Sequence, residues 1–324
     1  MNDEGSMIFR ALRKSWRYWN CMTHPGRARM GRLLKDEALY DRVPQAHERP
    51  GRATCDHLIN DPPAFETIPQ IVFQTWKSRV DIPNNYRVWR ETFHDQNPGF
   101  EILLWDDDDN REFVRARFPW FLPTYDLYPK EIYRADAVRP LFLFLFGGFY
   151  ADMDTECLRP LESQISIGNI LLGRMGYDKS FPHSIPNAIM ASRPYEYFWL
   201  FYVHLMIDRA REMSGDGSQI KRPEALTGPV ALYDAVSAFI ADPDAAIAAC
   251  APIVAQLPDY WRARLRRSLP TILPPETWYG IDWTNPLHRK VRARIQQERR
   301  LLSVEQARAL FPEATMVTYW SHSW

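Results

Sequence analysis

Two aspartates, Asp152 and Asp154, stand on alternate residues just after a Gly147-Gly148 pair. Alternate side chains of an extended strand point the same way, so the two carboxylates can converge on one point. Convergent carboxylates with no nearby cation need a metal ion or a proton to be tolerated. Hard oxygen ligands suit Mg²⁺ or Mn²⁺, which bind substrate phosphates through few protein ligands. The pair therefore predicts a diphosphate site, of the kind that a nucleotide-sugar enzyme needs.

An acid and a base precede this pair at i, i+3 spacing, Asp136 and Arg139, and such residues share one face of a helix. The alternative is a surface ion pair, which contributes little to stability. An isolated D-x-D sequence also has a plain alternative, a solvated turn. The closeness of the two blocks favours function for both. We predict that Asp136 accepts a hydrogen bond from a hydroxyl and that Arg139 is a cation for a sugar or phosphate.

Apolar runs and turn residues indicate the elements that must position these side chains. Helices and strands alternate along the chain, which indicates an α/β domain with a largely parallel sheet. The Asp152/Asp154 strand should end at the edge of the sheet where ligands gather. Pro140 should kink or restart its helix. We expect strands at 68–76, 100–105, 170–174 and 188–192. We expect helices at 83–94, 130–146, 195–211 and 228–240, and a further helix that the acid run 106–109 opens.

The composition is that of an ordinary soluble protein. The 324 residues are 46% apolar and 25% charged, with a net charge of zero, so composition gives no case for nucleic-acid binding. No apolar run reaches the roughly 20 residues that cross a bilayer. Four widely spaced cysteines form no CxxC pair, which argues against a disulfide framework or a zinc site and fits a reducing compartment.

The first 66 residues form a basic extension before a folded domain at 67–324. Residues 1–35 carry eight Lys or Arg and two acids. No signal peptide is visible, so we expect a cytoplasmic protein. Basic and apolar residues alternate in a helical manner near the start, which leaves two interpretations open. One is peripheral contact with the inner face of the membrane, and the other is a solvated leader.

The ordered blocks between 66 and 324 make the chain recognisable. It resembles the glycosyltransferases with a DXD sugar-binding region, which include initiating α-1,6-mannosyltransferases and inositolphosphorylceramide mannosyltransferases. A more distant likeness is to large glucosylating toxins. The blocks that carry the resemblance are Ile68–Trp76, 97–100, 104–106, Arg134–Arg139, Phe146–Leu161, Pro186–Ser192, Thr227–Pro229 and Ser323-Trp324.

The resemblance implies a GT-A fold, a single Rossmann-like domain, and transfer from a nucleotide sugar with retention at the anomeric carbon. It implies that Asp154 binds Mn²⁺ or Mg²⁺ directly and that Asp152 contacts the ribose and metal-bound water. It makes His322 a further metal ligand, and imidazole is an acceptable ligand for Mn²⁺. It also implies a nucleotide-sugar site formed by Gln74, Trp76, Asp136, Arg139, Asp152, Asn187 and Trp324.

We therefore predict a metal-dependent retaining hexosyltransferase, with Asp136, Arg139, Asp152 and Asp154 as its catalytic residues. The mannosyltransferase-like blocks favour GDP-mannose over UDP-hexoses as the donor, and a glycan or glycolipid is the expected acceptor. No carboxylate stands out as a nucleophile, which favours a same-face transfer. Three alternatives remain open. They are a sugar-nucleotide-binding protein whose catalysis has decayed, a metal-dependent phosphohydrolase, and a membrane-surface adaptor that uses the basic leader. The last of these leaves the acidic site unexplained.

Overall fold

The computed structural model describes residues 65–215, 222–282, 284–298 and 301–321. The predicted basic extension therefore lies almost wholly outside the described residues. The strands are β1 (Ile71–Thr75), β2 (Glu101–Trp105), β3 (Gly148–Ala151), β4 (Thr155–Cys157), β5 (Ile170–Gly173), β6 (Ile189–Ser192), β7 (Thr271–Leu273) and β8 (Met316–Thr318). The helices are α4 (Asn84–Gln96), α5 (Asp107–Arg117), α6 (Leu122–Leu127), α7 (Glu131–Leu145), η2 (Glu162–Gln164), α8 (Tyr197–Gly215), α9 (Pro223–Leu226), α10 (Pro229–Ala241), α11 (Pro243–Ala249), α12 (Ala251–Val254), α13 (Asp259–Arg262), α14 (Pro275–Trp278), α15 (Pro286–Glu298) and α16 (Val304–Leu310).

The central sheet has the order β2-β1-β3-β6-β5-β7. Strand β1 pairs in parallel with β2 and with β3, and β5 pairs in parallel with β7. Strand β6 is antiparallel to both of its neighbours, β3 and β5. The α/β class with a mostly parallel sheet, predicted from the sequence, is confirmed.

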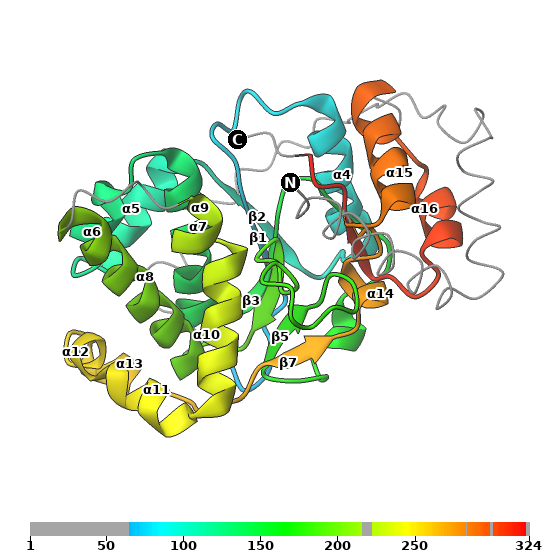
Figure 1. Cartoon of the computed structure of the whole chain (residues 1–324). Coiled ribbons are helices and arrows are strands. Elements are labelled where there is room, and N and C mark those ends of the chain that lie inside the picture. The colour runs from blue at the N-terminus through cyan, green and yellow to red at the C-terminus, as the bar shows by residue number, and fades with distance from the viewer. Residues whose placement is uncertain (1–64, 216–221, 283, 299–300, 322–324) are drawn as a thin grey trace, which may run out of the picture.

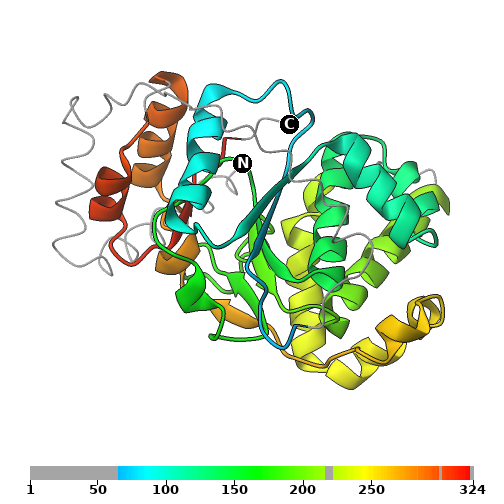
Figure 2. The same ribbon diagram turned by 180° about the vertical axis from the view of Figure 1, so that it is seen from behind.

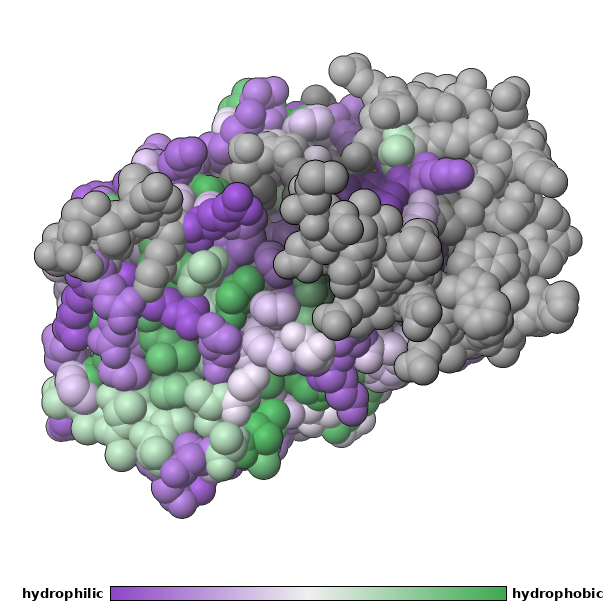
Figure 3. All heavy atoms as spheres, viewed as in Figure 1, coloured by the Kyte–Doolittle hydropathy of each residue, from purple (hydrophilic) through white to green (hydrophobic). Residues whose placement is uncertain are grey.

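Helices cover both faces of this sheet (Figures 1 and 2). Side chains alternate along β1, so Phe73 faces one core, with α5, α7, α8 and α10, while Val72 faces the other, with α4 and α14. A third core joins α4 to α16 and to the chain around β8. On the molecular surface, apolar residues gather over α10 and the alanine-rich helix α11 (Figure 3).

Helix α7 is the central support of the site, and every residue from Ala135 to Tyr150 is buried. A helix that is apolar nearly all round must be buried in this way. The sequence predicts a kink or a restart at Pro140, and the restart is wrong because the helix continues through that residue. Proline cannot donate the helical backbone hydrogen bond at this position, and its neighbours on both sides in the chain are buried.

The turn from α7 into β3 depends on two glycines, as the sequence predicted. Gly147 and Gly148 have φ angles of +68° and +86°, which side chains disfavour. A Cβ atom on Gly148 would also lie 2.6 Å from the carbonyl oxygen of Ile71. The glycines therefore let β3 start next to β1, and Asp152 follows the carboxyl end of that strand.

Candidate active site

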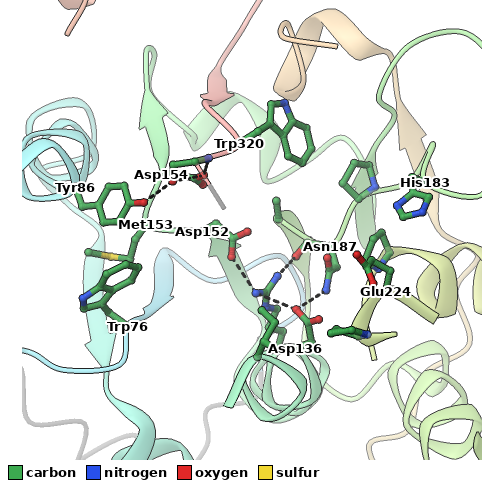
Figure 4. Close-up of a pocket in the computed structure, with 17 residues that line it drawn as sticks. Trp76, Tyr86, Asp136, Asp152, Met153, Asp154, His183, Asn187, Glu224 and Trp320 are labelled. Carbon is green, nitrogen blue, oxygen red and sulfur yellow. Dashed lines mark hydrogen bonds and ion pairs between the residues drawn. The ribbon is translucent and has the colours of Figure 1, made fainter. Parts of the chain in front are cut away.

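A pocket of about 350 Å³ opens at the carboxyl ends of β1 and β3. That volume is within the usual range for small-molecule sites. Strand β6 runs in the opposite direction, so its beginning meets the end of β3, and the Asp152 amide donates to the Ala188 carbonyl at 2.8 Å. Asn187 thereby comes to the same edge as Asp152. Figure 4 shows side chains from these strands and from α4, α7 and α9 around one space.

Arg139 is the centre of a buried network at the base of the pocket. It is 2% exposed, and its Nη2 atom lies 3.0 Å from Asp136 Oδ1 and 3.1 Å from Asp152 Oδ1. Its Nη1 atom donates to the Asn187 carbonyl at 2.9 Å, and its guanidinium lies over the Tyr150 ring at 4.6 Å. Asn187 Nδ2 in turn donates to Asp136 Oδ1 at 2.9 Å. This network fixes the positions of both carboxylates before any ligand binds.

Two details of the aspartate pair differ from the sequence analysis. The assumption that no cation lies nearby is wrong, because Arg139 contacts Asp152 directly. The pair also does not lie within a strand, since β3 ends at Ala151 and both aspartates follow it in the turn before β4. The carboxylates line one pocket because separate elements hold them there, α7 for Asp152 and the chain after β8 for Asp154.

Asp154 is held by the last described residues of the chain. Its Oδ2 atom accepts hydrogen bonds from the Ser321 amide at 2.6 Å and the Ser321 hydroxyl at 2.9 Å. Thr318 Oγ1 donates to Oδ1 at 3.2 Å, and the Tyr319 amide donates to the Asp154 carbonyl at 2.9 Å. Trp320, between these residues, has a positive φ of 52°, which is rare for a residue other than glycine and is found at functional sites. The segment after β8 thus orients Asp154 toward the pocket.

Asp152 and Asp154 are suited to hold a divalent cation. They supply hard carboxylate oxygens on one pocket wall, as Mg²⁺ or Mn²⁺ sites that share their ligands with a substrate diphosphate require. Within the described residues, no group of three or more His, Cys, Asp or Glu side chains is placed to hold a metal ion. A site made by these residues therefore needs ligands from the substrate or from water.

The pKa of Asp152 makes cation binding depend on pH. Burial raises it to about 7, the charges of Asp154 and Asp136 add to the increase, and Arg139 and the Tyr150 hydroxyl oppose it. A cation must displace the proton that this raised pKa retains. We expect the affinity for Mn²⁺ alone, measured by calorimetry, to fall about tenfold from pH 8 to pH 6, the change that one displaced proton gives. Asp152→Asn should bind more weakly with no such slope, and a flat wild-type profile would contradict the assignment.

Aromatic side chains line the end of the pocket near Asp154. Trp76 follows β1, and its ring meets that of Tyr86 edge-to-face at 4.8 Å. The Tyr86 hydroxyl is hydrogen-bonded to Ser321 Oγ. Trp320 stacks on Tyr279 at 5.5 Å and donates through Nε1 to the Ile281 carbonyl. Flat apolar faces of this kind suit a nucleoside.

The opposite end of the pocket contains polar groups that the sequence analysis missed. Glu224 comes from the short helix α9 and His183 from the chain between β5 and β6. Glu224 lies three residues before the Thr227–Pro229 block, which was the available signal. Tyr86, Trp320 and Ser321 were also missed. For Trp320 and Ser321 the available signal was proximity to the predicted terminal block, Ser323-Trp324.

Most of the predicted site residues that the structure describes come together. Those lining the pocket are Trp76, Asp136, Arg139, Asp152, Asp154 and Asn187. Gln74 is buried in β1 and does not line the pocket. Neither of its amide atoms has a hydrogen-bond partner within the described part of the chain. His322 and Trp324 lie outside the described residues.

Fold and site together define a glycosyltransferase-like α/β protein with a D-x-D pair in its pocket. Residues 83–171 match the family described as "Glycosyltransferase sugar-binding region containing DXD motif", which confirms the resemblance seen in the sequence. This part of the chain is therefore similar to the sugar-binding region of that family.

Curated relatives extend the match beyond this region. Inositol phosphoceramide mannosyltransferase 2 of Schizosaccharomyces pombe is 29% identical over 182 residues, which are 52% of this chain and 51% of that protein. The initiation-specific alpha-1,6-mannosyltransferase of Candida albicans is 34% identical over 31% of this chain and 28% of its own length. The chain thus spans about half the length of the first relative. Among solved structures, the PaToxG Glycosyltransferase superposes with a TM-score of 0.42 and 16% identity, over 62% of this chain and 84% of that one.

No helix among the described residues combines the length and the apolar character needed to cross a membrane.

Proposed function

We propose that this protein is a metal-dependent retaining hexosyltransferase that transfers mannose from GDP-mannose to a glycan or glycolipid. The observation that carries the proposal is the single pocket in which Asp152 and Asp154 lie beside the buried Asp136–Arg139 pair. Mannosyltransferases among the relatives support mannose as the sugar and a glycan or glycolipid as the acceptor.

The pocket has a separate place for each part of a nucleotide sugar. Trp76 and Tyr86 line the end at which we place the nucleoside. Asp152 and Asp154 would hold a divalent cation, whose charge offsets the negative charge that develops on a leaving diphosphate. Arg139 adds a fixed positive charge in a buried position, where electrostatic interactions are strong. The sugar then lies over the Arg139 network, where Asp136 accepts hydrogen bonds from its hydroxyls.

The contacts of Asp136 argue against a covalent intermediate in the proposed retaining transfer. Its carboxylate already pairs with Arg139 and accepts from Asn187, which makes it a weak nucleophile. We propose that the acceptor hydroxyl attacks on the face that the diphosphate leaves, through an oxocarbenium-like transition state. A glycosyl–enzyme adduct seen by intact-mass spectrometry would contradict this step.

The activity is tested by hydrolysis of a donor panel with Mn²⁺. The panel contains GDP-mannose, UDP-glucose, UDP-galactose and UDP-N-acetyl sugars. We expect slow, metal-dependent release of mannose from GDP-mannose, because water replaces the missing acceptor. Cleavage of a UDP-sugar instead would change the donor but keep the class. No cleavage of any donor and no nucleotide-induced rise in melting temperature would contradict the proposal.

A further inference from the structure

Glu224 is the carboxylate of the pocket that the proposed reaction does not use. One of its oxygens, Oε2, is buried and has no hydrogen-bond partner among the residues that the structure describes. Among the described residues, no ion pair forms to Glu224, since Arg139 pairs with Asp136 and Asp152. A buried polar atom without a partner costs free energy, so such atoms in folded proteins need an explanation. A ligand hydroxyl that donates to Oε2 would supply the missing partner.

The groups around Glu224 do not stabilise its negative charge. Its charge raises the pKa of the neighbouring Asp136, where burial is the main cause and Arg139 the main opposing charge. His183 lies close enough for its pKa to respond to Glu224, but burial lowers that pKa below its ordinary value. A neutral imidazole does not balance the carboxylate, although it can both donate and accept hydrogen bonds. The described residues around Glu224 therefore supply neither a counter-charge nor a hydrogen bond to its Oε2 atom.

The position of Glu224 indicates which part of a ligand it meets. Figure 4 shows Glu224 and His183 beyond Asn187, on the side of the pocket away from Trp76, Tyr86 and Asp154. A nucleotide sugar with its diphosphate at Asp154 and its nucleoside at the aromatic end extends its hexose toward Glu224. The pocket is also lined by the apolar side chains of Ile132, Pro223 and Pro229, which can pack against the C–H face of a sugar ring.

We propose that Glu224 accepts a hydrogen bond from a donor-sugar hydroxyl remote from the anomeric carbon, with His183 beside it, and thereby selects the hexose. This inference rests on the proposed function. Sites that bind a substrate hydroxyl with a buried polar group strongly reject analogues that lack it, because the protein group is then left unpaired. Glu224 is a specificity residue in this role and takes no part in bond breaking.

The test combines a variant with deoxy donors. Wild type and Glu224→Gln are compared on GDP-mannose and its 3-, 4- and 6-deoxy analogues, with Mn²⁺, by kcat/KM of donor hydrolysis. For one of these analogues, the kcat/KM of wild type should be at least about 100-fold lower than for GDP-mannose. Glu224→Gln should lower kcat/KM for GDP-mannose by about 10- to 100-fold and kcat/KM for that analogue by much less. The ratio of the two kcat/KM values should therefore be smaller in the variant than in wild type. The matched control is Glu313→Gln, at an exposed residue outside the pocket, which should leave all rates unchanged.

Three outcomes would overturn the inference. One is an equal loss on every donor, which would place Glu224 in the chemistry or the nucleotide site. Another is a variant that discriminates between GDP-mannose and the deoxy analogue as strongly as wild type does. The third is a covalent hexose adduct that forms on wild type and not on Glu224→Gln. The melting temperature separates these from misfolding, because removing an unpaired charge beside Asp136 should not lower it. If wild type cleaves no donor, the proposed function fails before the variant is examined.

Discussion

Asp154→Asn is expected to lower kcat/KM for metal-dependent donor cleavage by about 10³-fold, since it removes a carboxylate ligand and the charge stabilisation that a bound cation supplies. Asparagine keeps one acceptor oxygen but places an amide N–H₂ where Ser321 now donates twice. The variant should therefore also lose nucleotide-dependent stabilisation by Mn²⁺. The measurements are donor hydrolysis and the shift in melting temperature with GDP and Mn²⁺.

A second variant separates ligand loss from displacement of the segment after β8. Ser321→Ala removes the hydroxyl donor to Asp154 and keeps the backbone amide donor, so both carboxylate oxygens remain. We expect it to cost less than about tenfold in kcat/KM, in line with one lost hydrogen bond. If Asp154→Asn stays within tenfold of wild type, or if the two variants are equally impaired, Asp154 is not the metal ligand.

Arg139→Met is expected to lower the free energy of unfolding by about 3–5 kcal/mol, because it leaves two buried carboxylates without their counter-charge. Asp136 and Asp152 both contact the guanidinium, and burial raises the pKa of each. A carboxyl with a folded-state pKa above its unfolded value contributes stability at low pH that is lost as the pH rises through the folded pKa. The deficit should therefore be larger at pH 8 than at pH 5.5, and urea unfolding at the two pH values measures it.

Two controls make this result specific. Arg111→Met removes an exposed arginine whose Nη2 lies 2.8 Å from Asp126, and exposed pairs contribute about 1 kcal/mol or less. Adding Asp152→Asn to Arg139→Met should recover part of the stability, because one uncompensated charge disappears. A deficit no larger than that of Arg111→Met, or one independent of pH, would show that the buried network does not stabilise the fold.

Local chemistry allowed much of the framework to be predicted from the sequence. The acid run at 106–109 predicted a helix start, and Asp106 and Asp109 form a capping box there. The Gly147-Gly148 pair predicted the turn into β3, since few other residues adopt its backbone angles. Apolar runs predicted β1, β2, β5, β6 and α7, because a buried strand or helix needs apolar residues over a short, continuous stretch of the sequence. The i, i+3 spacing of Asp136 and Arg139 predicted their contact for the same local reason.

Tertiary structure alone decided which distant residues meet at the pocket. Contact between Asp152 and Arg139 depends on the packing of α7 under β3, and no sequence spacing encodes that distance. The support of Asp154 by Ser321 joins residues 167 positions apart, through the pairing of β4 with β8. The position of Glu224 depends on where α9 packs. That its buried Oε2 atom lacks a partner among the described residues becomes visible only in the folded structure. Sequence determined the residues that could do chemistry, and long-range packing decided their partners, because contacts between remote segments depend on the whole core.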